Sequence, residues 1–368
     1  MRNSDNNWRS SDIFCMNNFY LTRKDTSVMK GIAICAMLCH HLYTCPEYIG
    51  EGIVPYTGIQ AWIGILCKVC VALFLFCSGY GLAANYKAYS IKDDIKYIAK
   101  RLVKFYTNYW VIFLIFVPIT YFVFGRTLAD AYGQVNIPKR FVYDILAIQV
   151  PAYNITWWFN KLIIILYLLF PILYRVINIR PWVAILLSMV VVHLSDSIHI
   201  PYDNVGICLW QLPFILGISW KLYQDKLPRV CAWLSEHKKV FALSSMFILI
   251  CAIIVRMFPI IPYWNGLRVD GFVACAIALC VVSVIRCTRY MSEVLAFLGK
   301  HSMNIYMTHT FFNAYWHPEW LHTCEYMRGG GNFIVLMLIC LAVSLIIEQA
   351  KERSGFNKRV MRLISKLQ

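Results

Sequence analysis

The stretch that decides the fold runs from Lys30 to His41: Lys30-Gly-Ile-Ala-Ile-Cys-Ala-Met-Leu-Cys-His40-His41. It is an apolar segment with a cation at one end and two histidines at the other. An α-helix turns by about 100° per residue, so His41 lies within roughly 20° of the azimuth of Lys30 and about 16 Å further along the axis. His40 points about 100° away from that line. Because an ionisable group inside a membrane helix is costly, such a group indicates a functional site.

The composition of the whole chain indicates an integral membrane protein. Of the 368 residues, 60% are hydrophobic and 15% are charged, whereas a soluble domain is about half apolar and a quarter charged. The net charge of +16 first suggests nucleic-acid binding, but the positive residues lie between apolar runs, so we expect no nucleic-acid partner. The first 29 residues are polar, and they lack the apolar core of a signal peptide. We therefore expect the first apolar run to be an uncleaved span.

Ten apolar runs are candidate membrane helices, which need about 20 residues each. They are 27–45, 58–84, 106–124, 157–177, 181–195, 203–221, 239–258, 268–286, 300–316 and 332–349. With the N-terminus in the cytoplasm, 27 of the 35 Lys and Arg residues lie in cytoplasmic segments, 7 lie in outer segments, and Lys68 lies within a run. This distribution follows the positive-inside rule.

The sequence therefore predicts an all-α, polytopic bundle of about ten transmembrane helices in the cell membrane (plasma or inner), with both termini cytoplasmic. We divide it into a cytoplasmic segment 1–26, a single membrane domain 27–350 and a basic cytoplasmic tail 351–368.

Two groups of polar residues along the first and third runs suggest chemistry. Lys30 is either an anchor at the membrane edge or part of a site, and His41 is either a packed neutral imidazole or a group that transfers protons near neutral pH. Arg101 and Lys104 share a helix face. They either reflect the positive-inside bias or form an anion site for phosphates.

A third polar group lies in the ninth run. Ser302, Tyr306 and His309 fall on one helix face and predict a polar cavity, although His309 is equally suited to a structural hydrogen bond. Ser78 lacks the surroundings of a nucleophilic serine. A metal site is not expected, because His40 and His41 point apart. Asn154-Ile-Thr156 fits a glycosylation acceptor pattern that arises often by chance.

Five motifs in this order resemble the membrane acyltransferase family 3, and they cover nearly the whole chain. They are Lys30-x10-His41, Phe74-x-Phe-x-Ser78-Gly79, Arg101-x-x-Lys104, the stretch from Trp158-Phe159 to Tyr167 and Pro171, and Ser302-x3-Tyr306-x2-His309. The family usually has arginine where this chain has Lys30 and Lys104, and a lysine lacks the planar fork that binds anions through two hydrogen bonds.

The resemblance implies an enzyme that takes an acyl group, usually acetyl, from cytoplasmic acyl-CoA and delivers it across the membrane to a hydroxyl of a cell-surface or lipid-linked carbohydrate. Acetyl-CoA would be a donor substrate and not a bound cofactor, held by Lys30, Arg101 and Lys104. His41 would act as a general base or carry the acyl group, and Ser302, Tyr306 and His309 would line the acceptor cavity. Asp203 and Asp270 are weaker candidates for orienting the histidine or the sugar. The expected partners are acyl-CoA, the carbohydrate and the lipid bilayer.

A transporter or exporter of a small organic acid or sugar derivative is the alternative, since a path from a cation to a histidine also suits a proton. Against it, no pair of runs broken by Gly or Pro occupies matching positions in two halves of the chain. A structural or sensory membrane protein would leave the inner basic cluster without a ligand.

Overall fold

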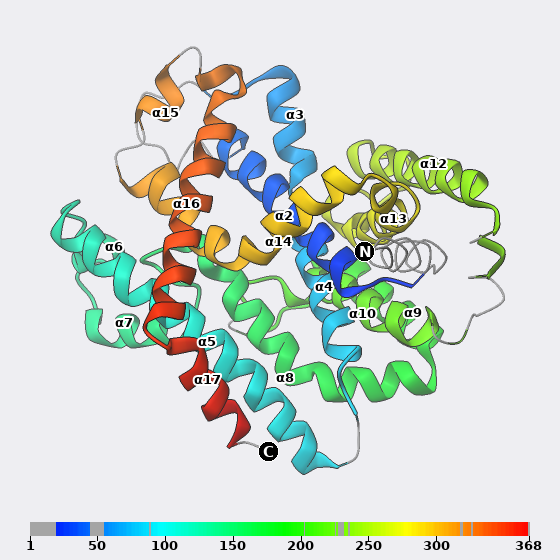
Figure 1. Ribbon diagram of the computed structural model, residues 1–368, viewed down its shortest axis with the longest axis horizontal. Helices are drawn as coiled ribbons and strands as arrows, with labels where there is room; N and C mark the ends of the chain where they lie inside the picture. Colours follow the sequence, from blue (N-terminus) through cyan, green and yellow to red (C-terminus); the bar gives the residue numbers. More distant parts are fainter. Residues whose placement is uncertain are drawn as a thin grey trace, which may run out of the picture.

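The computed structural model in Figure 1 describes residues 20–44, 55–87, 90–201, 203–224, 226, 232–234, 236–316, 319–324 and 327–366. This part of the chain is helical and contains no strand. The α-helices are α2 (Arg23–Tyr43), α3 (Gly58–Cys67), α4 (Cys70–Ala83), α5 (Ile91–Phe122), α6 (Leu128–Tyr132), α7 (Ile137–Leu146), α8 (Trp158–Ile179), α9 (Pro181–His193), α10 (Ile207–Gln224), α12 (Lys238–Met257), α13 (Asp270–Ser283), α14 (Arg289–Thr310), α15 (Glu319–Thr323), α16 (Asn332–Arg353) and α17 (Phe356–Ser365). The 3₁₀ turns are η2 (Ile155–Trp157), η3 (Gly266–Val269) and η4 (Ile285–Cys287), and the π-helical turns are η5 (Phe311–Tyr315) and η6 (Met327–Gly331).

Six helical segments in the described part are long and apolar enough to cross a membrane. They are Gly58–Ala83, Ile91–Phe122, Ile155–Ile179, Lys238–Met257, Gly266–Cys287 and Met327–Arg353. The other four predicted runs overlap α2, α9, α10 and α14. The prediction of an all-helical membrane protein is therefore confirmed, whereas the number of about ten spans and the cytoplasmic position of both termini stay predictions.

Helices α2 and α14 pack together at the centre of the molecule (Figure 1), and they cross at two glycines. A Cβ on Gly299 of α14 would lie 1.8 Å from the carbonyl oxygen of Ser27, and a Cβ on Gly31 of α2 would lie 2.0 Å from that of Leu295. Only glycine permits backbones to approach so closely. His41 and His309, ten residues beyond Gly31 and Gly299, still touch with ring centroids 4.9 Å apart, so the two helices run in the same direction.

The start of α2 is fixed by a capping box. The Thr22 hydroxyl accepts a hydrogen bond from the Asp25 amide, and the Asp25 carboxylate accepts one from the Thr22 amide, which satisfies two amides that have no partner within the helix. Asp25 also pairs with Arg286 in η4, between α13 and α14. The same residues therefore start α2 and hold it beside α14.

A second glycine crossing joins α4 to α10. A Cβ on Gly79 would lie 2.2 Å from the carbonyl oxygen of Phe214, and a Cβ on Gly217 would lie 2.2 Å from that of Phe76. A Cβ on Gly81, two residues after Gly79 on the same helix, would meet nothing within 4 Å. Close approach thus explains Gly79 but not Gly81.

The segment that leads into α8 is anchored by the buried side chain of Asp144 on α7. Its carboxylate accepts hydrogen bonds from the Tyr132 hydroxyl at 2.8 Å and from the amides of Tyr153 at 3.1 Å and Ala152 at 3.3 Å. Burial outweighs these hydrogen bonds and raises the pKa of Asp144 to about 6. The segment continues into Asn154, whose side chain is fully buried, so the structure contradicts the glycosylation pattern at Asn154.

Candidate active site

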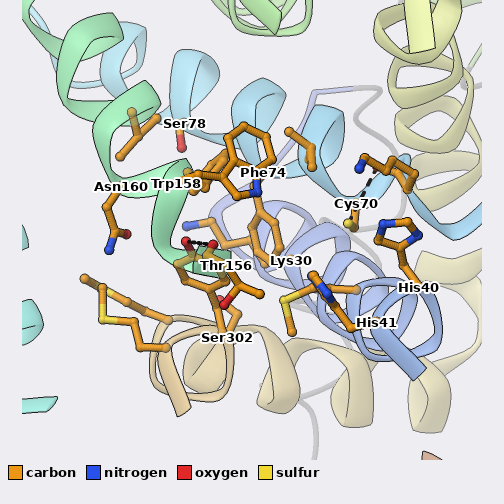
Figure 2. A pocket seen from close by; sticks show the side chains of 18 of the residues that line it. Lys30, His40, His41, Cys70, Phe74, Ser78, Thr156, Trp158, Asn160 and Ser302 are labelled. Atoms are coloured by element: carbon orange, nitrogen blue, oxygen red, sulfur yellow. Dashed lines mark hydrogen bonds between the residues drawn. The ribbon is translucent and has the colours of Figure 1, made fainter. Parts of the chain in front are cut away.

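A cavity of about 170 Å³ lies between α2, α4, α5, α8 and α14. Its lining residues on the five helices and their connections are Lys30, Met37, His40, His41, Lys68, Cys70, Val71, Phe74, Ser78, Phe105, Thr156, Trp158, Phe159, Asn160, Ile163, Tyr167, Ser302, Met303, Tyr306 and Met307. None of these lining residues is an aspartate or a glutamate. Figure 2 shows His40 and His41 on one side of the cavity, with Ser78 and Asn160 on the other. The cavity is therefore mainly apolar, with cationic and imidazole groups at defined positions.

His41 carries a ring nitrogen that is free for chemistry. Its Nδ1 is buried and has no hydrogen-bond partner among the described residues. The ring packs against those of His309 and His40, with centroids 4.9 and 5.2 Å away. The backbone of His41 is held by Asn313, whose amide donates to the His41 carbonyl oxygen at 3.3 Å. This arrangement fixes the ring position and leaves one nitrogen available to accept a proton.

In the two neighbouring histidines, Nδ1 is instead committed to a hydrogen bond. His40 Nδ1 lies 2.9 Å from the Gly64 carbonyl oxygen, and His309 Nδ1 lies 2.7 Å from that of Tyr306. A carbonyl oxygen only accepts, so Nδ1 carries the hydrogen in both rings. His309 is fully buried and is not among the cavity-lining residues, so it meets the cavity only through His41.

Ser302 and Tyr306 line the cavity from α14, as the helix-face argument predicts. Their hydroxyl hydrogens are already used: Ser302 donates to the Gly299 carbonyl oxygen at 2.9 Å, and Tyr306 donates to that of Thr156 at 2.8 Å. The Tyr306 bond, together with the Trp157 indole that donates to the Met307 carbonyl oxygen at 3.0 Å, attaches the start of α8 to α14. Both residues therefore shape the cavity wall and offer oxygen lone pairs to a ligand.

The three cations predicted from the sequence lie near the N-terminal part of α2, away from His41. Lys30 lines the cavity, whereas Arg101 and Lys104 are not lining residues. Arg101 donates to the Tyr97 hydroxyl at 3.0 Å and acts electrostatically on Tyr167, which does line the cavity. Lys104 is exposed and lies within the electrostatic reach of Arg101, Lys30 and Arg23.

We call the four residues Arg23, Lys30, Arg101 and Lys104 the basic cluster. The four positive charges repel one another unless an anion lies between them. The basic cluster therefore suits a ligand with several negative charges.

The two aspartates considered from the sequence have other partners. Asp203 accepts hydrogen bonds from the amides of Val205 and Ile207 at 3.1 and 2.9 Å, which stabilises the start of α10. Asp270 pairs with Arg256, with Nε and Oδ1 2.5 Å apart. Neither aspartate is bonded to His41 in the described structure.

Sequence reasoning assigned no role to several polar lining residues, among them Lys68, His40, Thr156 and Asn160. Lys68 had a signal, because it is a lone cation within an apolar run. His40 was set aside because it points away from the Lys30–His41 line. Thr156 and Asn160 had no signal, since the contact between the start of α8 and α14 joins residues about 150 positions apart.

The described residues contain no group of three or more His, Cys, Asp or Glu side chains placed to hold a metal ion. The site chemistry visible in these residues is therefore that of a proton acceptor, His41, in an apolar cavity next to the basic cluster.

Comparison with known proteins assigns the chain to a family. A family model described as an acyltransferase domain matches residues 25–349. No curated protein and no solved structure matches the chain significantly. The matched region includes every residue that lines the cavity, and the chain therefore belongs to the membrane acyltransferase family 3.

Proposed function

We propose that the protein transfers an acyl group, usually acetyl, from cytoplasmic acyl-CoA to a hydroxyl of a cell-surface or lipid-linked carbohydrate. The observation that carries this proposal is one cavity with Lys30 among its lining residues and a free His41 Nδ1. Membership of the acyltransferase family supports acyl transfer in general. The donor, the acceptor and the direction of transfer are our inference.

The donor half of the proposal rests on charge. The phosphates of coenzyme A are polyanionic, and the basic cluster offers Lys30, Arg101 and Lys104 as partners near the predicted cytoplasmic end of the cavity. Arginine binds a phosphate through two parallel hydrogen bonds, while lysine acts as a point charge. The mainly apolar wall beyond Lys30 suits the uncharged pantetheine arm and the thioester.

The acceptor half rests on His41. A hydroxyl placed against the free nitrogen loses its proton to the imidazole as its oxygen attacks the thioester carbonyl carbon. His309 and His40 pack against the ring from two sides, which fixes the position of that nitrogen. Ser302 and Tyr306 provide acceptor lone pairs for the other hydroxyls of a sugar.

The test is acyl transfer by the purified protein in proteoliposomes, with acetyl-CoA labelled in the acetyl group and the surface glycan of the source cell as acceptor. We expect labelled glycan with the wild type, and a fall of about 10²–10⁴-fold in rate for His41→Ala, the usual contribution of a general base. His237→Ala is the matched control, because His237 is exposed at the start of α12 and is not a cavity-lining residue.

Two outcomes would contradict the proposal. Transfer by His41→Ala at the wild-type rate would show that His41 is not the general base. Passage of free acetate into the vesicles without labelling of glycan would favour the transporter.

A further inference from the structure

Lys68 is a cation inside a membrane-spanning segment and lines the same cavity as His40 and His41. It lies at the junction of α3 and α4, where the Lys68 amide donates to the Ile65 carbonyl oxygen at 3.4 Å and the Val69 amide to that of Leu66 at 3.2 Å. These bonds span three residues instead of four, so the helix tightens at this point. The junction places the Lys68 side chain on the cavity wall.

The surroundings of Lys68 contain more positive than negative charge. Asp270 is close enough to Lys68 to interact with it electrostatically. Asp270 Oδ1, however, is already paired with Arg256 Nε at 2.5 Å, and the Asp270 and Arg256 side chains are 0% and 2% exposed. The other oxygen, Oδ2, is buried without a hydrogen-bond partner in the described structure. One carboxylate thus faces two cations, which leaves a net charge of about +1 beside the cavity.

Acyl transfer needs two groups from the enzyme: a base for the hydroxyl and a donor for the carbonyl oxygen, which becomes negative as the tetrahedral intermediate forms. His41 fits the first role. Most polar side chains near it cannot fill the second, because the hydrogens of His40, Ser302 and Tyr306 are already donated to backbone carbonyl oxygens.

Lys68 fits the second role. Its charge acts on both His40 and His41, and its ammonium makes no hydrogen bond or ion pair of those defined for the described residues. The neutral amide of Asn160 is unpartnered too but lies across the cavity from the two histidines (Figure 2). Lys30, the other lining cation, is about 16 Å from His41 along α2.

We propose that Lys68 is a further catalytic residue, which donates a hydrogen bond to the thioester carbonyl oxygen as that oxygen gains negative charge. This inference rests on the proposed function. His41 removes the proton of the acceptor hydroxyl while the hydroxyl oxygen forms a bond to the carbonyl carbon, and the π electrons of the carbonyl move onto the oxygen beside Lys68. When that electron pair returns, the carbon–sulfur bond breaks and the coenzyme A thiolate takes the proton from His41.

The experiment measures steady-state transfer by Lys68→Met and Lys68→Arg at varied acetyl-CoA concentration. We expect kcat to fall by about 10²–10³-fold in Lys68→Met, the usual effect of removing an oxyanion donor. The KM for acetyl-CoA should stay unchanged, because the basic cluster that holds the phosphates is intact. Lys68→Arg keeps the cation and should recover part of kcat.

Lys161→Met is the matched control. Lys161 is a half-buried lysine on α8 that bonds Asn204 at 2.7 Å and is not a lining residue of this cavity, so it should leave kcat near the wild-type value. Stabilisation by coenzyme A in a thermal shift assay shows that each variant is folded. If Lys68→Met does not fold, Lys68→Gln replaces it, since glutamine keeps a donor but loses the charge.

The remaining outcomes decide between the two proposals. An active wild type with an equally active Lys68→Met overturns the role of Lys68 alone. The same holds for a loss seen only as a raised KM for acetyl-CoA with kcat unchanged, which would make Lys68 a binding group for the donor. A wild type that binds acyl-CoA without transferring the acyl group overturns the proposed function and this inference together.

Discussion

Adjacent residues in one helix can have different roles because their hydrogen bonds differ. His40 and His41 both line the cavity, but His40 Nδ1 is bonded to the Gly64 carbonyl oxygen while His41 Nδ1 is free among the described residues. The azimuth argument from the sequence selected His41, and the geometry adds a chemical difference at Nδ1: a nitrogen that donates its own hydrogen to a carbonyl oxygen cannot accept a proton there. The catalytic role of His41 stays a prediction for the alanine test.

At the same scale, Asp144 predicts a pH dependence of stability. Its pKa in the folded protein, about 6, is above the ordinary value of 3.8, so the folded state binds this proton more tightly than the unfolded state does. The resulting stability is fully present below pH 3.8 and is lost as the pH rises through about 6. The wild type should therefore gain stability relative to Asp144→Asn as the pH falls from 7 to 4, by on the order of 2 kcal/mol.

Thermal unfolding of the detergent-solubilised wild type and variant at several pH values measures this difference. The asparagine variant cannot titrate at this position, so it serves as the control for other groups that titrate over the same range. A difference in stability that is constant with pH would show that Asp144 has the same pKa in both states.

At the scale of the element, the start of α5 differs from the start that hydropathy predicts. The third run was predicted from 106, but α5 begins at Ile91. The first turns of α5 contain Lys92, Asp93 and Asp94, so hydropathy does not mark them, whereas the Ser90 side chain caps the Asp93 amide at 3.2 Å and starts the helix there. Hydropathy reports the part of a helix inside the membrane, and capping reports where the helix begins.

The glycine crossings give a prediction with an internal control. In Gly79→Ala, the new Cβ would meet the Phe214 carbonyl oxygen at 2.2 Å, so α4 and α10 must separate, and we expect a loss of roughly 1–3 kcal/mol. Gly81→Ala on the same helix meets nothing within 4 Å and should be neutral or stabilising by about 0.5–1 kcal/mol. The melting temperatures of the two purified variants provide the comparison. Equal destabilisation by both substitutions would mean that α4 and α10 do not cross at Gly79.

At the scale of the whole molecule, two contacts between distant segments assemble the cavity. The crossing of α2 and α14 brings His41 to His309, and the bond from Tyr306 to the Thr156 carbonyl oxygen brings the start of α8 against the same pair. The C-terminal helix α17 lies along α5 (Figure 1) and contains part of the predicted basic tail. Because the cavity is shared between helices, no single segment contains the site.

The predicted topology can be tested with two native cysteines that are exposed in the structure. Cys287 and Cys324 are both exposed. The predicted topology places Cys287 on the cytoplasmic side and Cys324 on the outer side, because the distribution of Lys and Arg puts the α13–α14 connection inside. A membrane-impermeant maleimide added to intact cells should label the protein at Cys324 and not at Cys287.

Variants identify the labelled position: Cys324→Ser should lose label and Cys287→Ser should keep it. After permeabilisation both cysteines should react, which controls for their accessibility. Labelling at Cys287 in intact cells would reverse the proposed orientation and place the basic cluster on the outer side.

The sequence by itself determined the membrane class, the helical runs, the family resemblance and the Lys30–His41 line, because hydropathy, charge bias and helical spacing are local properties of the chain. Only the tertiary structure decided which polar groups meet. In the structure, Lys68 lines the same cavity as the two histidines. Asp270 forms an ion pair with Arg256, and Arg101 is not a lining residue of the cavity. These pairings depend on how helices cross, and the crossings depend on close contacts at glycines far apart in sequence, which no local pattern records.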